Sequence, residues 1–171
     1  MTHLPQLPDA PETGQEWYRD GVRFRCLGVE CGRCCSGRMG PGAVWVNRRE
    51  ISQLAEHLEI PIVEFKRRFV RRLQGRFSLR ERSNYDCIFY REGTGCSVYE
   101  ARPGQCRTYP FWPRIMATET TWQIEAEHCP GIGYDATRVA ARDIRQQLEP
   151  GAHQQGGPMP LSETRSRDTA E

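Results

Sequence analysis

Apolar and polar residues alternate near the start of the chain. Val22, Phe24 and Cys26 are separated by two arginines, which is the period-two pattern of a half-buried strand. Such a strand would bring Cys26 in from the side of the core. A short apolar stretch over residues 43–46 predicts a second strand.

The spacing then changes to that of a helix. Apolar residues recur at Ile51, Leu54, Ala55 and Leu58, which places them on one helical face. Asn47 precedes this run, and Glu50 lies three residues after Asn47. The two residues therefore predict a capping box at the start of the helix.

A second amphipathic helix is predicted from Pro61 to a stop signal at Gly75. Its apolar side would hold Ile62, Phe65, Phe69 and Leu73. The opposite side carries Lys66, Arg67, Arg68, Arg71, Arg72 and, just beyond, Arg76. This basic run could bind an acidic partner or nucleic acid, but no aromatic stacking platform accompanies it, so a solvated surface is the simpler interpretation.

The elements predicted downstream are shorter. Residues 77–79 read as a strand, residues 87–99 as a hairpin with a glycine-containing loop, and residues 121–124 as a last strand. Residues 102–113 are rich in proline and aromatics, which predicts an ordered irregular segment that opens with one helical turn. Asp135 could cap a final helix that packs through Ala141, Ile144 and Leu148.

These elements lie between two polar ends. Residues 1–16 and 149–171 are rich in proline, glycine or charge, and we expect both to be disordered tails. Residues 17–148 then form one domain, of a size that can bury its own core. The expected fold is α+β: a small, irregular, cysteine-rich domain built around a metal, with short strands, a hairpin and about three helices.

Composition bears on the partners of this domain, its cellular compartment and the state of its cysteines. The formal net charge of +2 decides little about partners. The sequence has neither a membrane-length apolar run nor a segment typical of a signal peptide, so we expect a cytoplasmic protein with reduced thiols. For eight cysteines in such a chain, metal ligation is a better interpretation than disulfides.

Four of the cysteines lie within ten residues. They are Cys26, Cys31, Cys34 and Cys35, and the other four are Cys87, Cys96, Cys106 and Cys129. The spacing Cys31-x-x-Cys34 lets two thiolates converge on one ion. Adjacent residues such as Cys34 and Cys35 usually project apart, so one centre or two remain possible. The glycines in this stretch favour a loop wrapped closely around a site.

Familiar cysteine templates fit this pattern poorly. A zinc ribbon needs two Cys-x-x-Cys pairs, whereas the chain has one such pair. Neither the bacterial nor the plant-type ferredoxin spacing occurs, and the strand–helix context of a thioredoxin motif is missing. No nucleophile elbow, phosphate-binding loop or paired-carboxylate motif is present either. The candidate chemistry is therefore that of the thiols.

Other side chains could support a thiolate site. Four thiolates around a divalent ion carry a net charge of about −2, which favours nearby cations. The arginines beside the cysteines in sequence are Arg25, Arg33, Arg38 and Arg107. They either compensate that charge or are ordinary surface residues. His128 could replace one thiolate, although a lone histidine is more often a surface or hydrogen-bonded residue.

Six ordered blocks of sequence are similar to a known family. The blocks are Phe24-Arg-Cys26, Cys31-Gly-Arg-Cys34-Cys35, Asp86-Cys87-Ile-Phe89, Gly95-Cys96-Ser-Val-Tyr99, Arg102-Pro-Gly-Gln-Cys106-Arg-Thr-Tyr-Pro110 and Cys129-Pro-Gly131. Together they resemble the YkgJ-type cysteine-cluster family of zinc- or iron-chelating domains, often described as iron–sulfur-cluster-containing proteins or oxidoreductases. The resemblance spans about residues 18–135. It implies that all eight cysteines are candidate metal ligands.

The residues and the resemblance lead to two main hypotheses. The first is a cysteine-ligated metal protein with an iron–sulfur cluster, of the [4Fe–4S] type, and a redox or electron-transfer role. It would act as an oxidoreductase or a redox accessory protein, with a redox or protein partner that the sequence does not identify. The alternative is a structural or interaction domain held by zinc, without catalysis. A metal carrier is a third hypothesis.

Overall fold

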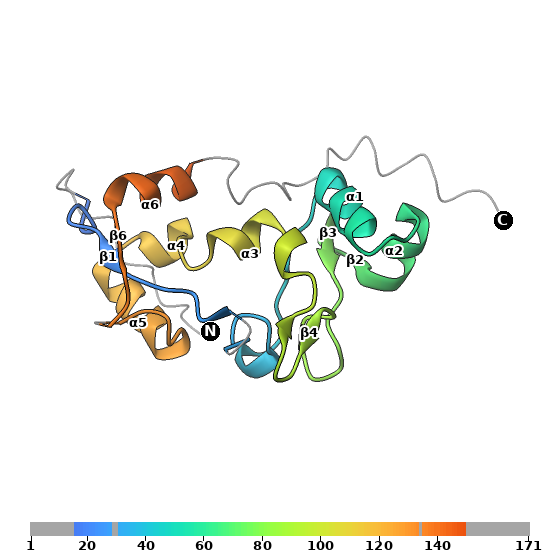
Figure 1. The fold of residues 1–171 in the computed structure, drawn as a ribbon, viewed down its shortest axis with the longest axis horizontal. Coiled ribbons are helices and arrows are strands. Elements are labelled where there is room, and N and C mark those ends of the chain that lie inside the picture. The colour runs from blue at the N-terminus through green and yellow to red at the C-terminus, as the bar shows by residue number, and fades with distance from the viewer. Residues whose placement is uncertain (1–15, 29–30, 134, 150–171) are drawn as a thin grey trace, which may run out of the picture.

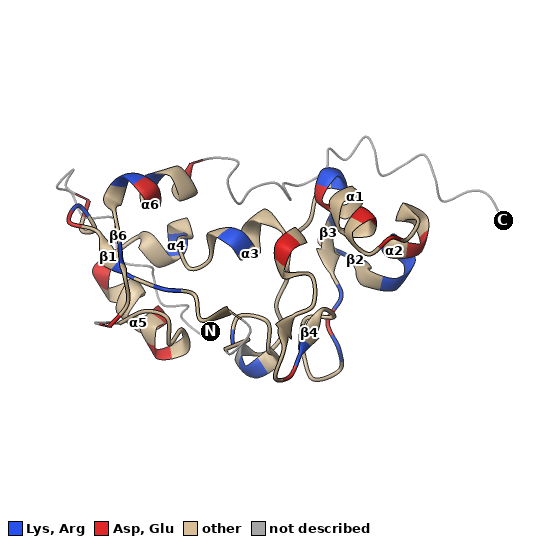
Figure 2. Ribbon diagram, in the orientation of Figure 1, with Lys and Arg blue, Asp and Glu red and all other residues tan. Residues whose placement is uncertain are grey.

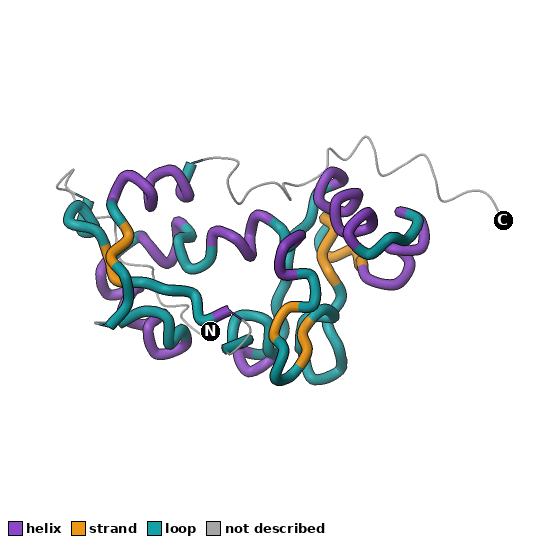
Figure 3. Tube along the Cα trace, viewed as in Figure 1, coloured by secondary structure: helices purple, strands orange, loops and turns teal. Residues whose placement is uncertain are grey.

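The described chain is built from short helices and two-stranded antiparallel ladders (Figure 3). The computed structural model describes residues 16–28, 31–133 and 135–149, which form a small α+β fold, as expected. Almost all of the two predicted tails lies outside these residues. No helix in the described part of the chain is long and apolar enough to cross a membrane.

One continuous stretch of chain builds the first hydrophobic core. It contains α1 (Arg48–His57), α2 (Ile62–Phe69) and the hairpin of β2 (Val70–Leu73) and β3 (Arg76–Leu79). The first core consists of Val46, Ile51, Leu54, Ala55, Phe65, Val70, Leu79, Phe89 and Val98. The predicted capping box is confirmed, because Asn47 Oδ1 accepts from Glu50 N at 2.8 Å and Glu50 Oε2 accepts from Asn47 N at 2.9 Å.

The prediction for the second helix was wrong beyond Phe69. Gln74 and Gly75 both adopt positive φ, 52° and 74°, as the two-residue turn of a tight hairpin requires. This turn pairs Leu73 with Arg76 and makes residues 70–73 a strand. Ile62, predicted to face inward, is 47% exposed, because α2 buries Phe65 instead.

In the basic run, Lys66, Arg67 and Arg68 of α2 and Arg72 of β2 are exposed, as a solvated surface requires. Arg71 is instead half-buried in an ion pair with Glu81. Lys66 and Arg72 both lie over the ring of Phe77, at 5.2 and 5.1 Å from its centroid. Arg68 forms an ion pair with Glu64 at 2.9 Å. Basic residues are also spread over α3, α4 and α6 (Figure 2), so the positive charge is not confined to this surface.

The hairpin predicted within residues 87–99 is confirmed. β4 (Tyr90–Arg91) pairs with β5 (Gly95–Cys96), with Tyr90 opposite Cys96. The strand predicted at residues 43–46 is reduced to one bridge, between Trp45 and Ser78. A 3₁₀ turn, η3 (Tyr99–Ala101), then leads toward α3 (Gly104–Thr108).

The second core combines the two ends of the described chain. β1 (Val22–Arg23) pairs with β6 (Arg138–Val139), and α4 (Pro113–Met116), α5 (Glu119–His128) and α6 (Ala141–Leu148) pack around them (Figure 1). Its buried residues are Tyr18, Val22, Phe111, Ile115, Met116, Trp122, Ala141 and Ile144. The Phe111 and Trp122 rings stack at 5.8 Å.

Two local predictions in this region were wrong. Residues 121–124 lie within helix α5, because Thr118 caps it through a hydrogen bond from Thr121 N at 3.1 Å. The final helix begins at Ala141 and is not capped by Asp135. The reason is that Arg138 and Val139 must be extended to pair with β1.

Helix α3 connects the two cores. At its first residue, Gly104 N donates to buried Glu50 Oε1 at 2.7 Å, which ties α3 to α1. Gln105 accepts from Trp45 N and donates to Ala43 O, both at 2.9 Å. Its carbonyl accepts from Trp112 Nε1 at 3.1 Å. Cys106 thus follows a residue that is held from both sides.

Candidate metal centre

The cysteine-rich loop lies close against the β4–β5 hairpin. Gly32 has a positive φ of 59°, and a side chain there would collide with the Tyr90 ring. Gly37 begins a 3₁₀ turn, η2 (Gly37–Met39), and a side chain at Gly37 would collide with the backbone of Asn84. The predicted role of glycine in close backbone approach holds at these two positions.

Two hydrogen bonds hold this loop in register with the segment that carries Cys87. Gly37 N donates to Asp86 Oδ1 at 2.7 Å, which holds the pKa of the Asp86 carboxyl below its usual value. Cys87 N donates to Cys35 O at 2.8 Å. Cysteines that are far apart in sequence are therefore brought together by the backbone, before any metal is considered.

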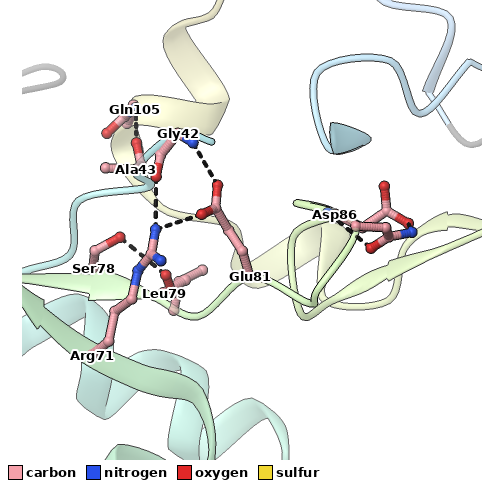
Figure 4. Close-up of polar contacts among 9 residues, drawn as sticks. Gly42, Ala43, Arg71, Ser78, Leu79, Glu81, Asp86 and Gln105 are labelled. Atoms are coloured by element: carbon pink, nitrogen blue, oxygen red, sulfur yellow. Dashed lines mark hydrogen bonds and ion pairs between the residues drawn. The ribbon is translucent and has the colours of Figure 1, made fainter. Parts of the chain in front are cut away.

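The neighbouring network of Arg71 fixes the far end of the loop (Figure 4). Arg71 Nη2 donates to Glu81 Oε2 at 2.6 Å and to Gly42 O at 2.7 Å. Gly42 N donates to the other Glu81 oxygen at 2.7 Å. Because each partner contacts the other two, the end of the loop that follows the cysteines is tied to β2 and to the segment just after β3.

Five thiols gather beside this loop. We call them the thiol cluster: Cys34, Cys35, Cys87, Cys96 and Cys106. The sulfurs of the adjacent Cys34 and Cys35 are 3.8 Å apart, so both face the same side. Cys35 also shares a hydrogen bond with Cys96, on strand β5. This arrangement favours one centre for the adjacent pair.

Mutual influence within the thiol cluster shifts the pKa of each member. The hydrogen bond from Cys35 lowers the pKa of Cys96 to about 6 and also lowers that of Cys34, while the pKa of Cys35 rises. Burial raises the pKa of Cys87 to about 11, and it raises that of Cys106 as well. The cluster thus mixes thiols that ionise readily with thiols that resist ionisation.

Cys31 and Cys129 lie at the edge of the thiol cluster, next to the second core. Burial raises the pKa of Cys129, and Cys31 and Cys34 are close enough to contribute to that rise. Tyr109 shares a hydrogen bond with Cys129, and its hydroxyl also donates to Glu125 Oε1 at 2.6 Å. Burial and the Glu125 bond raise the pKa of the Tyr109 hydroxyl.

Cys26 stands further from the thiol cluster. Its sulfur accepts from Gly28 N at 3.4 Å and lies 3.9 Å from the Tyr99 hydroxyl. The Tyr99 ring in turn lies under the guanidinium group of Arg102, at 3.6 Å from the ring centroid. The structure therefore links Cys26 to the other cysteines through Tyr99 and Arg102.

Arg102 is the supporting residue that the sequence analysis missed. Its positive charge adds to the effect of the Cys35 hydrogen bond in lowering the pKa values of Cys34 and Cys96, and it opposes the burial that raises the pKa of Cys106. Yet its Nε is buried without a hydrogen-bond partner among the described residues. A buried donor without an acceptor is costly, and an anion between the thiols and Arg102 would satisfy it. Its position in the block Arg102-Pro-Gly-Gln-Cys106 was the available signal.

The arginines chosen from the sequence have different places. Arg33 and Arg38 line a cavity beside the thiol cluster. Arg107 Nη1 donates to Arg102 O at 2.5 Å and so braces Arg102, whereas Arg25 N joins the backbone ladder with Gly131. His128 lines the same cavity at the end of α5.

The cavity measures about 480 Å³ and opens against the thiol cluster. Four of the cluster's cysteines line it, namely Cys34, Cys35, Cys87 and Cys106. Within residues 16–28, 31–133 and 135–149, no three His, Cys, Asp or Glu side chains are placed closely enough to hold one metal ion. The thiols of the described residues thus line the cavity, but no three of them converge on one ion position.

Comparisons with known proteins agree with this cysteine-based centre. A family model described as "Putative zinc- or iron-chelating domain" matches residues 25–130. A protein of Methanocaldococcus jannaschii with the name "Uncharacterized protein MJ0661" is 30% identical over 119 residues. That match covers 67% of this chain and 61% of the relative's own length. No solved structure matches the chain.

Proposed function

Since the chain belongs to the family of zinc- or iron-chelating domains, we propose that it carries an iron–sulfur cluster and has a redox or electron-transfer role. The thiol cluster would supply ligands first, with Cys26, Cys31 and Cys129 as the remaining candidates. Thiolates are the ligands that hold such clusters. One-electron chemistry is what the bound group would supply.

The observation that carries this proposal is the convergence of five thiols from separate segments. Cys34 and Cys35 come from the loop, Cys87 precedes β4, Cys96 lies in β5, and Cys106 comes from α3. Binding of a metal would require these side chains to rotate toward one another. Because the backbone already holds the segments in register, such a rotation leaves the fold unchanged.

The surroundings of the thiol cluster also support a redox centre. Arg102 offers a positive charge and a free buried donor, and both stabilise an anionic cluster and adjust its reduction potential. Structural zinc sites are closed, whereas four of these cysteines line an open cavity. Access from outside suits a centre that exchanges electrons.

The test is chemical analysis of protein that has never met air. We expect a brown protein with an absorption band at about 400 nm and with iron and acid-labile sulfide in similar amounts. Cys106→Ala should lose most of the iron, whereas Ser52→Ala, at an exposed residue of α1, should retain it. Colourless protein with stoichiometric zinc would contradict the proposal.

Zinc is the second candidate, and one observation favours it. The cysteines join segments of both cores, as a structural zinc site does when it contributes folding energy directly. In that case the protein holds zinc without sulfide, shows no redox signal, and unfolds when a chelator is added. A chelator that removes zinc and leaves the circular dichroism unchanged would exclude this alternative.

A further inference from the structure

The cavity beside the thiol cluster has the size and lining of a small-molecule site. Its volume of about 480 Å³ falls within the range of roughly 300–1,000 Å³ for ligand pockets. Val44 and Leu79 give it apolar surface, and Tyr109 and Trp112 give it aromatic surface. Because cluster cysteines form part of the wall, a bound molecule would touch the candidate metal ligands.

The aromatic part of the lining is held in place. Trp112 Nε1 donates to Gln105 O at 3.1 Å, and the Trp112 ring meets the Tyr109 ring edge-on at 5.3 Å. Tyr109 is fixed by its bond to Glu125. A preorganised aromatic wall favours a flat apolar group, since little side-chain entropy is lost when that group binds.

Carboxylates in the lining are mostly engaged. Glu81 forms its ion pair with Arg71 and also accepts from Gly42 N. Glu125 accepts the short hydrogen bond from Tyr109. Glu127 is the other carboxylate of the lining. Arg71 neutralises Glu81, whereas Glu125 keeps its negative charge, so Glu125 and Glu127 face the four arginines of the lining.

The arginines of the lining are more available. Arg33, Arg38 and Arg114 are exposed, and none forms an ion pair with a carboxylate of the described residues. Arg38 acts on Asp86 only at a distance. The fourth cation, Arg80, lies 3.5 Å from Arg67 O. Positive charge thus exceeds free negative charge in this lining.

The thiols have cations of their own outside the cavity. Arg102 lies over the Tyr99 ring, whose hydroxyl is 3.9 Å from the Cys26 sulfur, and Arg82 donates to Ile88 O and Tyr90 O next to Cys87. Neither arginine belongs to the cavity lining. The three exposed arginines have no carboxylate partner among the described residues, and guanidinium groups bind carboxylate and phosphate through paired hydrogen bonds.

We propose that the cavity binds a small organic anion, a flat apolar body that carries a carboxylate or a phosphate. The anionic group lies by Arg33, Arg38 and Arg114, and the body lies against Trp112 and Tyr109. Binding itself needs no metal. That the anion is a substrate or electron partner of the centre rests on the function proposed above.

The experiment measures binding to the anaerobically purified full chain by titration calorimetry. The probes are phenyl phosphate, benzoate, inorganic phosphate and benzyl alcohol. We expect phenyl phosphate or benzoate to bind at least tenfold more tightly than either inorganic phosphate or benzyl alcohol, because only the first two combine ring and charge. Whichever of the two binds more tightly identifies the anionic group.

Matched arginine variants locate the site. Arg114→Gln should weaken binding of the better probe about tenfold, whereas Arg142→Gln, at an 85% exposed side chain on α6, should not change it. Equal binding of neutral and anionic probes, or equal affinity in both variants, overturns the inference. A melting curve shows that both variants are folded.

Metal and sulfide content, measured on the same samples, separates the two proposals. Anion binding that depends on Arg114, in protein that contains no iron, would support the anion site and contradict the iron–sulfur function. Iron and sulfide in protein that binds no probe would support the iron–sulfur function and contradict the anion site. Each proposal can therefore fail alone.

Discussion

The two hydrophobic cores differ in how the chain builds them. The first core uses residues between Val46 and Val98, and its helices and hairpins follow one another along the chain. The second core needs Tyr18 and Val22 from one end and residues 111–144 from the other. Its ends are joined by a ladder of two residues per strand, a bridge between Phe24 and Ile132 and a hydrogen bond from Arg25 N to Gly131 O.

From this difference we infer that the thiol centre also has a structural role. A core made of local contacts closes short loops, whereas a core made of distant segments must close a long one at a larger entropic cost. The cysteines span both cores: Cys87 and Cys96 pack against the first core, Cys129 follows α5 of the second core, and the others lie on the segments that connect the two. We expect a bound metal to stabilise the second core more than the first, because it closes the same long loop.

The largest expected effect comes from truncating one buried side chain in either core, in separate variants. Leu54 and Ile144 are both fully buried, one in each core. Leu54→Ala and Ile144→Ala should each cost about 2–5 kcal/mol in unfolding free energy. Hydrogen exchange should show faster opening of the whole chain in the first variant and of α5 and α6 alone in the second.

The comparison would fail if both variants opened the same amides. In that event the two cores would form a single cooperative unit. Chemical denaturation followed by tryptophan fluorescence offers a second readout, since Trp17 and Trp122 lie in or against the second core.

An intermediate effect is expected where Arg102 meets the thiols. Arg102→Gln removes the cation beside Cys34, Cys96 and Cys106. Loss of such a supporting residue typically weakens metal binding by about 10–100-fold. An anionic redox centre should also show a lower reduction potential, because removal of a positive charge disfavours the added electron.

Arg67→Gln provides the control, because Arg67 is an exposed arginine on α2. Unchanged metal affinity and potential in Arg102→Gln would show that Arg102 only packs against Tyr99. A lower melting temperature with unchanged metal affinity and reduction potential would lead to the same conclusion.

The smallest effect should come from the helix caps. Asn47 caps α1 in the first core and Thr118 caps α5 in the second, each through a capping box. Asn47→Ala and Thr118→Ala should each cost about 1 kcal/mol. Metal removal should enlarge the effect of Thr118→Ala relative to Asn47→Ala, which thermal unfolding with and without chelator can measure.

Elements with local signals could be predicted from the sequence. The capping box of α1 depends on two residues three apart, and the β4–β5 hairpin on a glycine-containing loop between apolar runs. Residues 70–73 were misread because Phe69 and Leu73 fit helical spacing, while Gln74-Gly75 is a turn signal that outweighs it. A local sequence pattern predicts an element correctly only where no stronger local signal, such as a turn sequence, favours another structure.

Elements that depend on distant partners could not be predicted. Residues 121–124 have strand-forming side chains, but the fold uses Trp122 as a helical residue that stacks on Phe111. The β1–β6 pairing joins the two ends of the domain. The same holds for the centre: all eight cysteines were candidates, yet only the fold shows which five gather and that Arg102 joins them.

Hydrogen exchange of the metal-loaded and the metal-stripped chain tests the central claim, that the thiol centre joins the two cores. After anaerobic removal of the metal, we expect amides of α5 and α6 to lose most of their protection while amides of α1 keep theirs. The same loss in α1, or unchanged protection in all three helices, would contradict it.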